Sequence, residues 1–184
     1  MKKLTFLMAA LVMLAACNNI SKKSEATAAA EQAPTQDTIV YEHEYLVKVG
    51  DMAPDFTLKY TDGSEFTLSA LRGKVVMLQF TASWCGICRG EMPHIESRIW
   101  QPHKDNADFV LVGVDREEPR EVAEEYTAKI GTTYPMLLDE KGDVFASYAL
   151  RKSGITRNVL IDRDGRIVKL TRRFVEPEFN DLVA

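Results

Sequence analysis

Residues 75–88 read Val75-Val-Met-Leu-Gln-Phe-Thr-Ala-Ser-Trp-Cys-Gly-Ile-Cys88, so an apolar strand over 75–80 leads directly into two cysteines three positions apart. Side chains three positions apart on a helix lie about 5 to 6 Å apart at Cβ. A small local adjustment reaches the separation of about 3.8 Å that a disulfide requires. We therefore expect Cys85 and Cys88 to open and close a disulfide without unfolding the chain.

The two thiols are expected to differ in acidity. A cysteine at a helix N-terminus faces unpaired backbone N–H groups and the positive end of the helix dipole. The pKa of Cys85 should therefore lie below the free value of about 8.5. Cys88 lies one turn further into the helix and should keep its proton until a mixed disulfide forms. The spacing predicts that Cys85 is the nucleophile and Cys88 the resolving thiol.

A static disulfide and a zinc site are the alternatives for this pair. Zinc needs four ligands, but the third cysteine of the chain, Cys17, is far away in sequence and no second Cys-x-x-Cys pair exists. A stabilising disulfide gains most by closing a long loop, whereas Cys85 and Cys88 close a very short one. Redox chemistry is therefore the favoured interpretation.

The N-terminus has the pattern of an export signal. Met1-Lys-Lys is basic, residues 4–14 are apolar, and Leu14-Ala-Ala-Cys17 resembles the lipobox of bacterial lipoproteins. We expect a signal peptide over 1–16 and a lipid on Cys17, which would place the protein outside the cytoplasm, facing the periplasm. An ordinary signal peptide and an uncleaved anchor are the alternatives, but the apolar run is shorter than the roughly 18 to 20 residues that a membrane helix needs.

Composition defines the remaining organisation. Residues 17–38 are rich in Ala, Ser, Thr, Lys, Glu and Gln and are expected to form a flexible tether. Residues 39–184 are enough for one domain, which we expect to be monomeric and free of cofactors. The net charge is −4, and removal of Lys2 and Lys3 with the leader makes it −6. An acidic domain argues against nucleic-acid binding.

The apolar pattern predicts alternating strands and helices. Strands are expected near 46–49, 54–58, 65–68, 75–80, 109–114 and 136–138, with helices over 86–103 and 119–130. Pro93 should kink the first helix. An antiparallel hairpin should turn at Asp164-Gly165. This order predicts an α/β sandwich with a central mixed sheet.

A family resemblance follows from several segments together. The run Phe80-Thr-Ala-Ser-Trp-Cys-Gly-Ile-Cys-Arg-Gly-Glu-Met-Pro93 resembles the active site of the TlpA/ResA thiol-disulfide oxidoreductases. Gly50-Asp-Met-Ala-Pro-Asp-Phe-Thr-Leu58, Leu68-Ser-Ala-Leu-Arg-Gly-Lys74 and Val159-Leu-Ile-Asp-Arg-Asp-Gly-Arg-Ile-Val168 resemble other parts of that family, so the likeness extends over roughly residues 46–184. It implies a thioredoxin-like fold with an N-terminal strand extension.

The resemblance also implies an activity. Its members mostly reduce disulfides of extracytoplasmic proteins, using electrons from a membrane donor. A role in cytochrome c maturation would make the partner an apocytochrome, while a general substrate pool or another redox protein remain alternatives. From physics alone, a strongly depressed pKa at Cys85 would instead make the pair oxidising.

Two residues near the thiols have candidate roles. Glu91 matches the glutamate of the family pattern Cys-x-x-Cys-x-x-Glu-x-Pro. A partly buried carboxylate there would raise the pKa of the cysteines or relay the proton of Cys88, whereas the alternative is a solvated surface glutamate. Trp84 is expected to present an apolar rim to a protein substrate, with burial in the core as the alternative.

Thr156 is where the sequence departs from the family. The family has a cis-proline facing the cysteines, but the matching segment here is Gly154-Ile-Thr-Arg-Asn-Val-Leu-Ile-Asp162. A cis bond before threonine is costly, so the loop is either strained or trans, and substrate pairing at Ile155 is in doubt. The hydroxyl could donate a hydrogen bond to the reacting sulfur, or the missing ring could admit a metal or another substrate. We favour the hydrogen bond.

A thiol peroxidase of the peroxiredoxin type is one alternative function. Such enzymes share the thioredoxin fold and use an arginine, here Arg157, with a threonine or serine three residues before the cysteine. Here Ala82 is three residues before Cys85, and Thr81 is four before it. The shifted hydroxyl and the close resolving cysteine argue against peroxidase activity.

A thioredoxin-fold copper chaperone is the second alternative. Cu(I) sites of that kind need a histidine beside the two cysteines. The chain has three histidines, His43, His94 and His103, and each is more simply explained as a surface residue. No metal is therefore expected.

Overall fold

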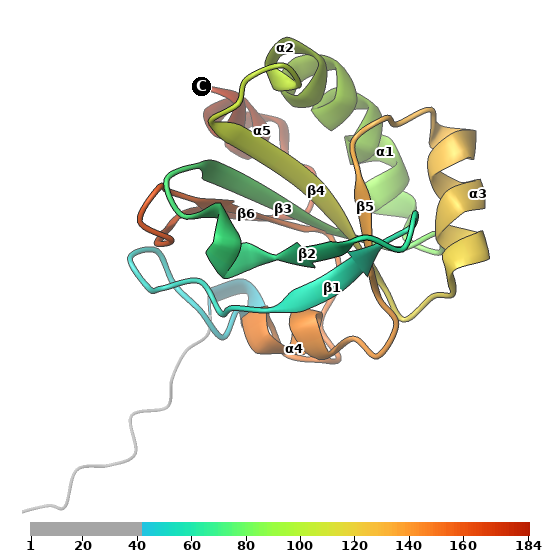
Figure 1. The fold of residues 1–184 in the computed structure, drawn as a ribbon, viewed down its shortest axis with the longest axis horizontal. Helices are drawn as coiled ribbons and strands as arrows, with labels where there is room; N and C mark the ends of the chain where they lie inside the picture. The colour runs from blue at the N-terminus through green and yellow to red at the C-terminus, as the bar shows by residue number, and fades with distance from the viewer. Residues whose placement is uncertain (1–41) are drawn as a thin grey trace, which may run out of the picture. The chain divides into compact units, whose positions relative to one another are not determined.

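Strand β3, Val75–Thr81, lies inside a seven-stranded sheet and is buried over nearly its whole length. The protein is described by a computed structural model, in which residues 42–184 are placed. The strands follow the order β2-β1-β5-β4-β3-β6-β7, with helices over both faces of the sheet (Figure 1). This arrangement confirms the predicted α/β thioredoxin-like fold with a mixed sheet.

The other strands are β1 (Thr57–Tyr60), β2 (Glu65–Thr67), β4 (Phe109–Arg116), β5 (Met136–Asp139), β6 (Arg157–Ile161) and β7 (Ile167–Arg172). The helices are α1 (Gly86–Ile95), α2 (Gln101–His103), α3 (Arg120–Ile130), α4 (Asp143–Tyr148) and α5 (Glu176–Val183). Two 3-10 helices, η1 (Glu42–Glu44) and η2 (Leu68–Leu71), and a π-helical segment, η3 (Glu96–Trp100), complete the structure.

The parallel strands determine where the site lies. β3 runs parallel to β4 and β4 runs parallel to β5, whereas the other pairs are antiparallel. Thr81 pairs with Asp115 at the carboxyl ends of β3 and β4. Because carboxyl ends of parallel strands share one edge of a sheet, the segments that follow β3 and β4 start side by side.

Alternate side chains of β3 enter two separate cores. Leu78 and Phe80 pack on one face with Phe145 and Tyr148 of α4. Met77 packs on the opposite face, in a cluster built from α1, η3, α3 and α5. A strand with both faces covered must be apolar at successive positions, which explains the continuous apolar run in the sequence.

The N-terminal segment differs from its prediction. No strand forms over 46–49, and the strand predicted at 54–58 begins only at Thr57. Instead the chain follows the outer edge of β7, where Gly50 N donates to Ile167 O and Ile167 N donates to Asp51 O. Gly50 has a positive φ of 94° and Pro54 has no N–H, so a regular ladder cannot continue. The segment still covers backbone groups of an edge strand.

The predicted helix over 86–103 is present as three differently wound segments. α1 ends at Ile95, η3 has π geometry, and α2 completes the run. Pro93 lies inside α1 and cannot donate the backbone hydrogen bond of a regular helix. Ser97 Oγ donates to Pro93 O at 2.8 Å. The irregularity predicted at Pro93 is thus a change from α-helical to π-helical geometry, which begins at Glu96.

The remaining predictions match closely, with two omissions. Strands 65–68, 109–114 and 136–138, helix 119–130 and the hairpin at Asp164-Gly165 correspond to β2, β4, β5, α3 and the β6–β7 turn. Gly165 adopts φ 85° in that turn. Helices α4 and α5 were not predicted, because each is short and its apolar positions are few.

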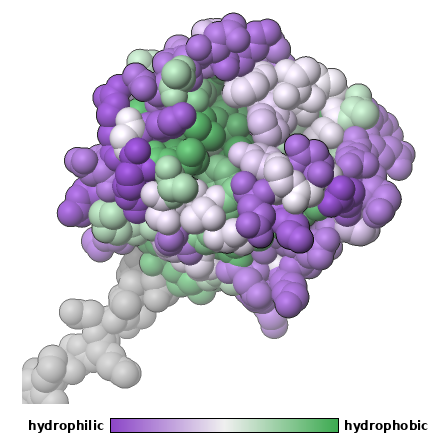
Figure 2. Space-filling model, in the orientation of Figure 1, coloured by the Kyte–Doolittle hydropathy of each residue, from purple (hydrophilic) through white to green (hydrophobic). Residues whose placement is uncertain are grey.

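Polar side chains cover most of the face shown in Figure 2, while apolar side chains are visible in a hollow near α5 and β4. A pocket of about 230 Å³ lies in this part of the fold, and its apolar lining includes Met77, Ile99, Phe109 and Leu182. Within residues 42–184, no helix has both the length and the apolar character needed to cross a membrane.

Candidate active site

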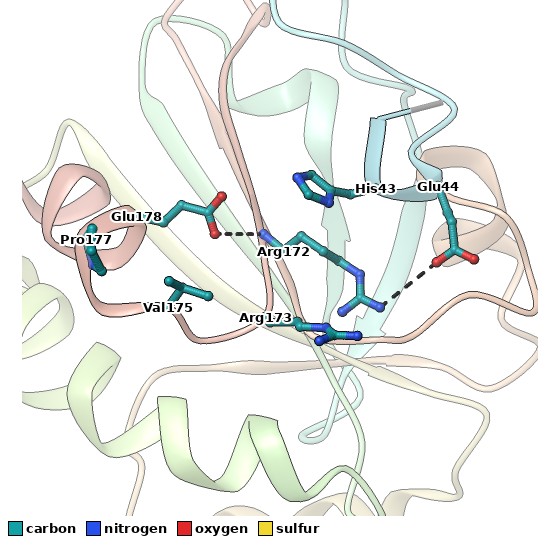
Figure 3. A pocket seen from close by; sticks show the side chains of 7 residues that line it. All are labelled: His43, Glu44, Arg172, Arg173, Val175, Pro177 and Glu178. Atoms are coloured by element: carbon teal, nitrogen blue, oxygen red, sulfur yellow. Dashed lines mark hydrogen bonds and ion pairs between the residues drawn. The ribbon is translucent and has the colours of Figure 1, made fainter. Parts of the chain in front are cut away.

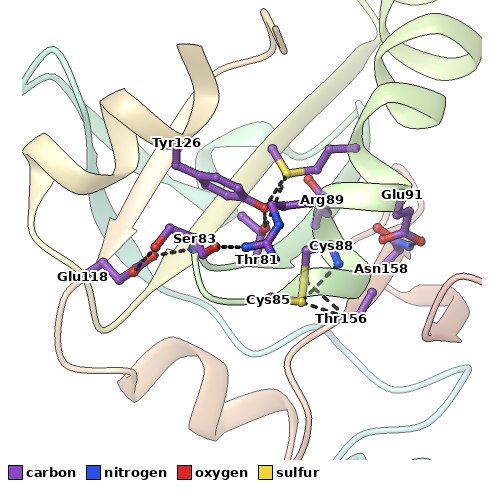
Figure 4. The surroundings of a disulfide bond; sticks show 12 residues. Thr81, Ser83, Cys85, Cys88, Arg89, Glu91, Glu118, Tyr126, Thr156 and Asn158 are labelled. Atoms are coloured by element: carbon purple, nitrogen blue, oxygen red, sulfur yellow. Dashed lines mark hydrogen bonds between the residues drawn. A yellow bond between two sulfur atoms is a disulfide. The ribbon is translucent and has the colours of Figure 1, made fainter. Parts of the chain in front are cut away.

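Cys85 and Cys88 form a disulfide at the start of α1, with their Cα atoms 5.3 Å apart (Figure 4). Cys85 is the N-cap residue of α1, and its sulfur accepts the backbone N–H of Cys88 at 3.1 Å. The two cysteines therefore occupy the predicted helix start. Its place at the N-terminus of α1 and the N–H of Cys88 favour a negative charge on the Cys85 sulfur after reduction.

The two sulfur-bearing residues differ in exposure. Cys85 retains 7% of its surface, whereas Cys88 retains none. A partner protein approaching the sheet edge therefore reaches Cys85 first, and Cys88 lies behind it in the core.

Thr156 lies directly against the disulfide. Its Oγ1 is 3.3 Å from the sulfur of Cys85 and 3.3 Å from that of Cys88. Disulfide sulfurs carry no proton, so the hydroxyl is the donor. Without proline, this position could provide a hydrogen bond to sulfur or open space for a metal or another substrate. The structure contains the contact that the hydrogen bond requires. The neighbouring side chain of Ile155 is 2% exposed and packs with the cysteines in the core, so it offers no surface to a substrate.

Apolar side chains surround the exposed side of the cysteines. Trp84 is 57% exposed and Ile87 is 47% exposed. Burial of Trp84 in the core is thereby excluded. Exposed apolar side chains on both sides of Cys85 make an apolar rim, which is suited to contact with another polypeptide.

Glu91 lies one turn after Cys88 and is only 1% exposed, so it is not a solvated surface residue. One carboxylate oxygen accepts the amide of Asn158 at 2.8 Å, and the other has no hydrogen-bond partner among residues 42–184. Burial raises the pKa of Glu91 to about 7, although the hydrogen bond from Asn158 opposes the rise. Glu91 can therefore gain or lose a proton near neutral pH.

A second group of polar residues lies on the other side of the cysteines. Glu118 accepts hydrogen bonds from the backbone N–H and the Oγ of Ser83, each at 2.6 Å. Arg89 Nη1 donates to the Ser83 carbonyl at 2.6 Å (Figure 4). Behind them Asp115 is fully buried, and burial together with the charge of Glu118 raises the pKa of Asp115 to about 8.

Asn158, Asp115, Ser83 and Glu118 were not predicted as site residues. Asp115 directly follows the apolar run 109–114, and Asn158 directly precedes the apolar run 159–161. A polar residue next to a buried strand is the signal that could have identified these two. Ser83 and Glu118 carry no comparable signal, because their contact depends on two separate loops.

An open pocket lies between η1, the end of β7 and the start of α5 (Figure 3). It has a volume of about 450 Å³ and is lined by His43, Glu44, Arg172, Arg173, Val175, Pro177 and Glu178. Arg173 N donates to Thr156 O at 3.1 Å, which connects the pocket wall to the site. Neither cysteine lines this pocket.

The residues considered for peroxide chemistry point elsewhere. Thr81 Oγ1 lies 3.0 Å from the hydroxyl of Tyr126. Arg157 is fully buried, stacks over Tyr45 at 4.3 Å and donates to Ser153 Oγ at 2.9 Å. Neither side chain has a hydrogen bond to Cys85 in the structure.

The histidines do not gather at the cysteines. The ring of His94 lies 4.9 Å from that of Phe174, the ring of His103 lies 5.7 Å from that of Phe109, and His43 lines the open pocket. In the part of the chain that the structure describes, no three or more His, Cys, Asp or Glu side chains form a group able to hold a metal ion.

Comparison with known proteins gives a family match over most of the domain. The Redoxin family model matches residues 48–184. The thiol-disulfide oxidoreductase ResA of Geobacillus thermodenitrificans is 32% identical over 124 residues, which cover 67% of this chain and 69% of that protein.

Two solved structures are similar in both sequence and fold. A solution structure from Bacteroides thetaiotaomicron, whose proposed class is protein disulfide isomerase, is 64% identical with a TM-score of 0.74, covering 76% of this chain and 88% of that one. A crystal structure from Chlorobium tepidum, proposed to be the thiol:disulfide interchange protein DsbE, is 28% identical with a TM-score of 0.62, covering 74% and 93%. With the disulfide at the start of α1, these matches show that the chain belongs to the Redoxin family and is a thiol-disulfide oxidoreductase similar to ResA.

Proposed function

We propose that this protein reduces disulfides of extracytoplasmic proteins while a lipid on Cys17 holds it at a membrane. The observation that carries the proposal is the partial exposure of Cys85 beside the apolar rim of Trp84 and Ile87, with Cys88 buried behind it. That arrangement presents one sulfur to a polypeptide and protects the other. The direction of electron flow follows the family resemblance.

The reaction takes two exchange steps. The Cys85 thiolate attacks one sulfur of the substrate disulfide, forms a mixed disulfide and releases the first substrate thiolate. Cys88 then loses its proton and attacks the Cys85 sulfur, which releases the second substrate thiolate. Two electrons pass to the substrate, and the Cys85–Cys88 disulfide remains. A membrane protein with a reduced dithiol must reduce it again before the next cycle.

Two neighbours support these steps. The Thr156 hydroxyl, 3.3 Å from each sulfur, donates a hydrogen bond that stabilises the Cys85 thiolate. Glu91, with a pKa of about 7, accepts the proton that Cys88 must lose. Trp84, which is 57% exposed, contacts the substrate, whereas Ile155 is only 2% exposed as a whole residue and meets a substrate only if the side chains over it move.

The membrane anchor rests on the sequence. The signal peptide over 1–16, Cys17 and the tether to residue 38 lie outside the described residues. The basic start, the apolar run and Leu14-Ala-Ala-Cys17 support export and lipidation. With Cys17 lipidated, both remaining cysteines lie in the active site, so the mature chain holds one dithiol and no structural disulfide.

The reduction potential of the Cys85–Cys88 pair tests the direction of the reaction. We expect a value near or below about −250 mV, close to that of thioredoxin. A reductase needs such a low reduction potential because it must donate electrons to the disulfides of its substrates. Equilibration of the protein with glutathione and dithiothreitol buffers measures it. A value near about −120 mV would identify a disulfide donor and reject the reductase.

Single cysteine variants test the order of attack. Cys85→Ser should abolish disulfide reduction, because the attacking thiol is lost. Cys88→Ser should accumulate mixed disulfides with substrate, because the resolving step is lost. Non-reducing gel electrophoresis after mixing with a disulfide-bearing protein separates the two results. Equal residual activity in both variants would contradict the assigned roles.

Thr156→Val tests the hydrogen bond to sulfur. Valine keeps the shape of threonine but removes the donor, and a hydrogen bond to a charged group contributes about 1.5 to 3 kcal/mol. The pKa of Cys85 should therefore rise by about 1 to 2 units, measured by thiolate absorbance during a pH titration of the reduced protein. Thr57→Val, on the distant strand β1, is the matched control and should leave that pKa unchanged. An unchanged pKa in Thr156→Val would exclude the contact from thiolate stabilisation.

Glu91→Gln tests the buried proton. The folded-state pKa of Glu91, about 7, lies above the ordinary value of 4.5, so ionisation opposes folding. Relative to Glu91→Gln, the wild-type free energy of unfolding should fall by about 3 kcal/mol as the pH rises from 4.5 to about 7, and stay level above that. Urea denaturation of the oxidised proteins measures it. Glu124→Gln, an exposed control, should give no such difference, and a pH-independent difference for Glu91→Gln would refute the raised pKa.

A further inference from the structure

Asn158 of β6 is a buried amide held between two side chains. It is 1% exposed, and its Nδ2 donates to Glu91 Oε1 at 2.8 Å and to Thr171 Oγ1 at 2.9 Å (Figure 4). In the sheet, Asn158 pairs with Thr171 of β7 on one side and with Gln79 of β3 on the other. Directly paired residues point to the same face of a sheet. These polar side chains therefore form a row that lies beneath Glu91 of α1.

Stability alone does not explain an amide at this position. Asn158 Oδ1 has no hydrogen-bond partner among residues 42–184, and an unpaired buried polar atom is costly. An apolar side chain of similar size would avoid that cost. The amide is better explained by the two groups that accept its N–H bonds.

The Glu91 carboxylate depends on this amide for a hydrogen bond. One of its oxygens accepts the N–H of Asn158, and the other has no partner among residues 42–184. A hydrogen bond to the charged form of a buried acid favours that form. Asn158 therefore opposes the effect of burial, which disfavours an ionised Glu91.

The other groups that face Glu91 contribute less or act in the opposite direction. Burial raises the pKa of Glu91 most, and Asn158 lowers it more than Gln79 does. Gln79 Nε2 makes no hydrogen bond of good geometry. Glu178 of α5 raises the pKa of Glu91 through its negative charge. Tyr134 stays neutral, because burial raises its own pKa well above the usual value.

We propose that Asn158 is a positioning residue for the resolving step, in which its amide, held by Thr171, keeps the Glu91 carboxylate in the ionised form that accepts the Cys88 proton. In that step the S–H proton of Cys88 passes to Glu91, and the new thiolate attacks Cys85 Sγ. The bond between Cys85 and the substrate sulfur breaks, and the substrate sulfur leaves with the electron pair. The inference rests on the role of Glu91 under the proposed function and is independent of the direction of electron flow.

The two exchange steps can be timed separately with an aromatic disulfide, dithiobis(nitrobenzoate), whose thiolate product is coloured. The full chain carries Cys17→Ser, so that Cys85 and Cys88 are its only thiols. In the reduced protein, attack by Cys85 releases one coloured thiolate and attack by Cys88 releases the second. The rate of the first phase depends on the reagent concentration, whereas the rate of the second does not.

Asn158→Leu keeps the size of the side chain and removes the donor. Loss of a hydrogen bond to a charged group should raise the pKa of Glu91, about 7 in the wild type, by about 1 to 2. The ionised form then becomes about 5- to 50-fold rarer at pH 7, and the second phase should slow by the same factor. The first phase should stay unchanged. In the Glu91→Gln protein, Asn158→Leu should have no further effect on the second phase.

Two threonine variants complete the comparison. Thr171→Val leaves the donor in place but removes the contact that holds the amide, and should slow the second phase about 2- to 5-fold. It keeps the proposal testable if Asn158→Leu fails to fold. Thr81→Val is the matched control, because it removes a different buried hydrogen bond, to Tyr126. It should leave both phases unchanged.

The outcomes separate this proposal from the proton relay. Equal slowing by Asn158→Leu with and without Glu91→Gln, or equal slowing of both phases, would overturn the role of Asn158. So would a slow second phase in Glu91→Gln beside an unchanged one in Asn158→Leu, which leaves the relay through Glu91 intact. An unchanged second phase in Glu91→Gln overturns the relay itself, and the role of Asn158 with it.

Discussion

The chain must pass from a strand buried on both faces to a helix capped by a reactive cysteine, and it does so within residues 82–85. The parallel pairing of β3 with β4 sets where that turn lies, because both strands end at the same sheet edge. The N-cap position of Cys85 then follows from the helix start. Thr156 comes to the same place because β6 pairs with β3 on its other side. Strand register thus brings the site residues together, and the ends of the strands fix where the loops begin.

The sheet keeps two of the buried carboxyls apart from the buried arginines. Glu91 and Asp115 lie on the face covered by α1 and α3. The buried arginines lie on the α4 face, where Arg116 and Arg157 sit 4.4 and 5.9 Å from the ring of Phe145. The carboxyls consequently have no buried cation to hold them ionised, and burial raises the pKa of both. Two groups that exchange protons near neutral pH are therefore placed close to a thiol pair whose chemistry moves protons.

The sequence predicted those features of the fold and the site that depend on residues close together in the chain. The apolar runs of β3 and β4, the cysteine spacing and the Asp164-Gly165 turn each depend on neighbouring residues, and all were predicted. Residues 46–49 were predicted as a strand, but no strand forms there, and Gly50 and Pro54 limit the segment to a few edge contacts. The contact of Ser83 with Glu118 joins residues 35 positions apart. No local pattern encodes it, so it required the structure.

Two hydrogen-bond donors converge on the sulfur of Cys85. The backbone N–H of Cys88 and the Thr156 hydroxyl both donate to it, and each donor favours a thiolate over a thiol. A proline at position 156 could offer no such donor, so this stabilising contact with the Cys85 sulfur depends on the threonine. Negative charge on the nearby carboxyls acts in the other direction, because it disfavours a further anion. Since Glu91 and Asp115 lose their protons near neutral pH, their opposition strengthens as the pH rises. The reduction potential of the cysteine pair therefore depends on the two hydrogen-bond donors at the Cys85 sulfur and on the protonation of Glu91 and Asp115.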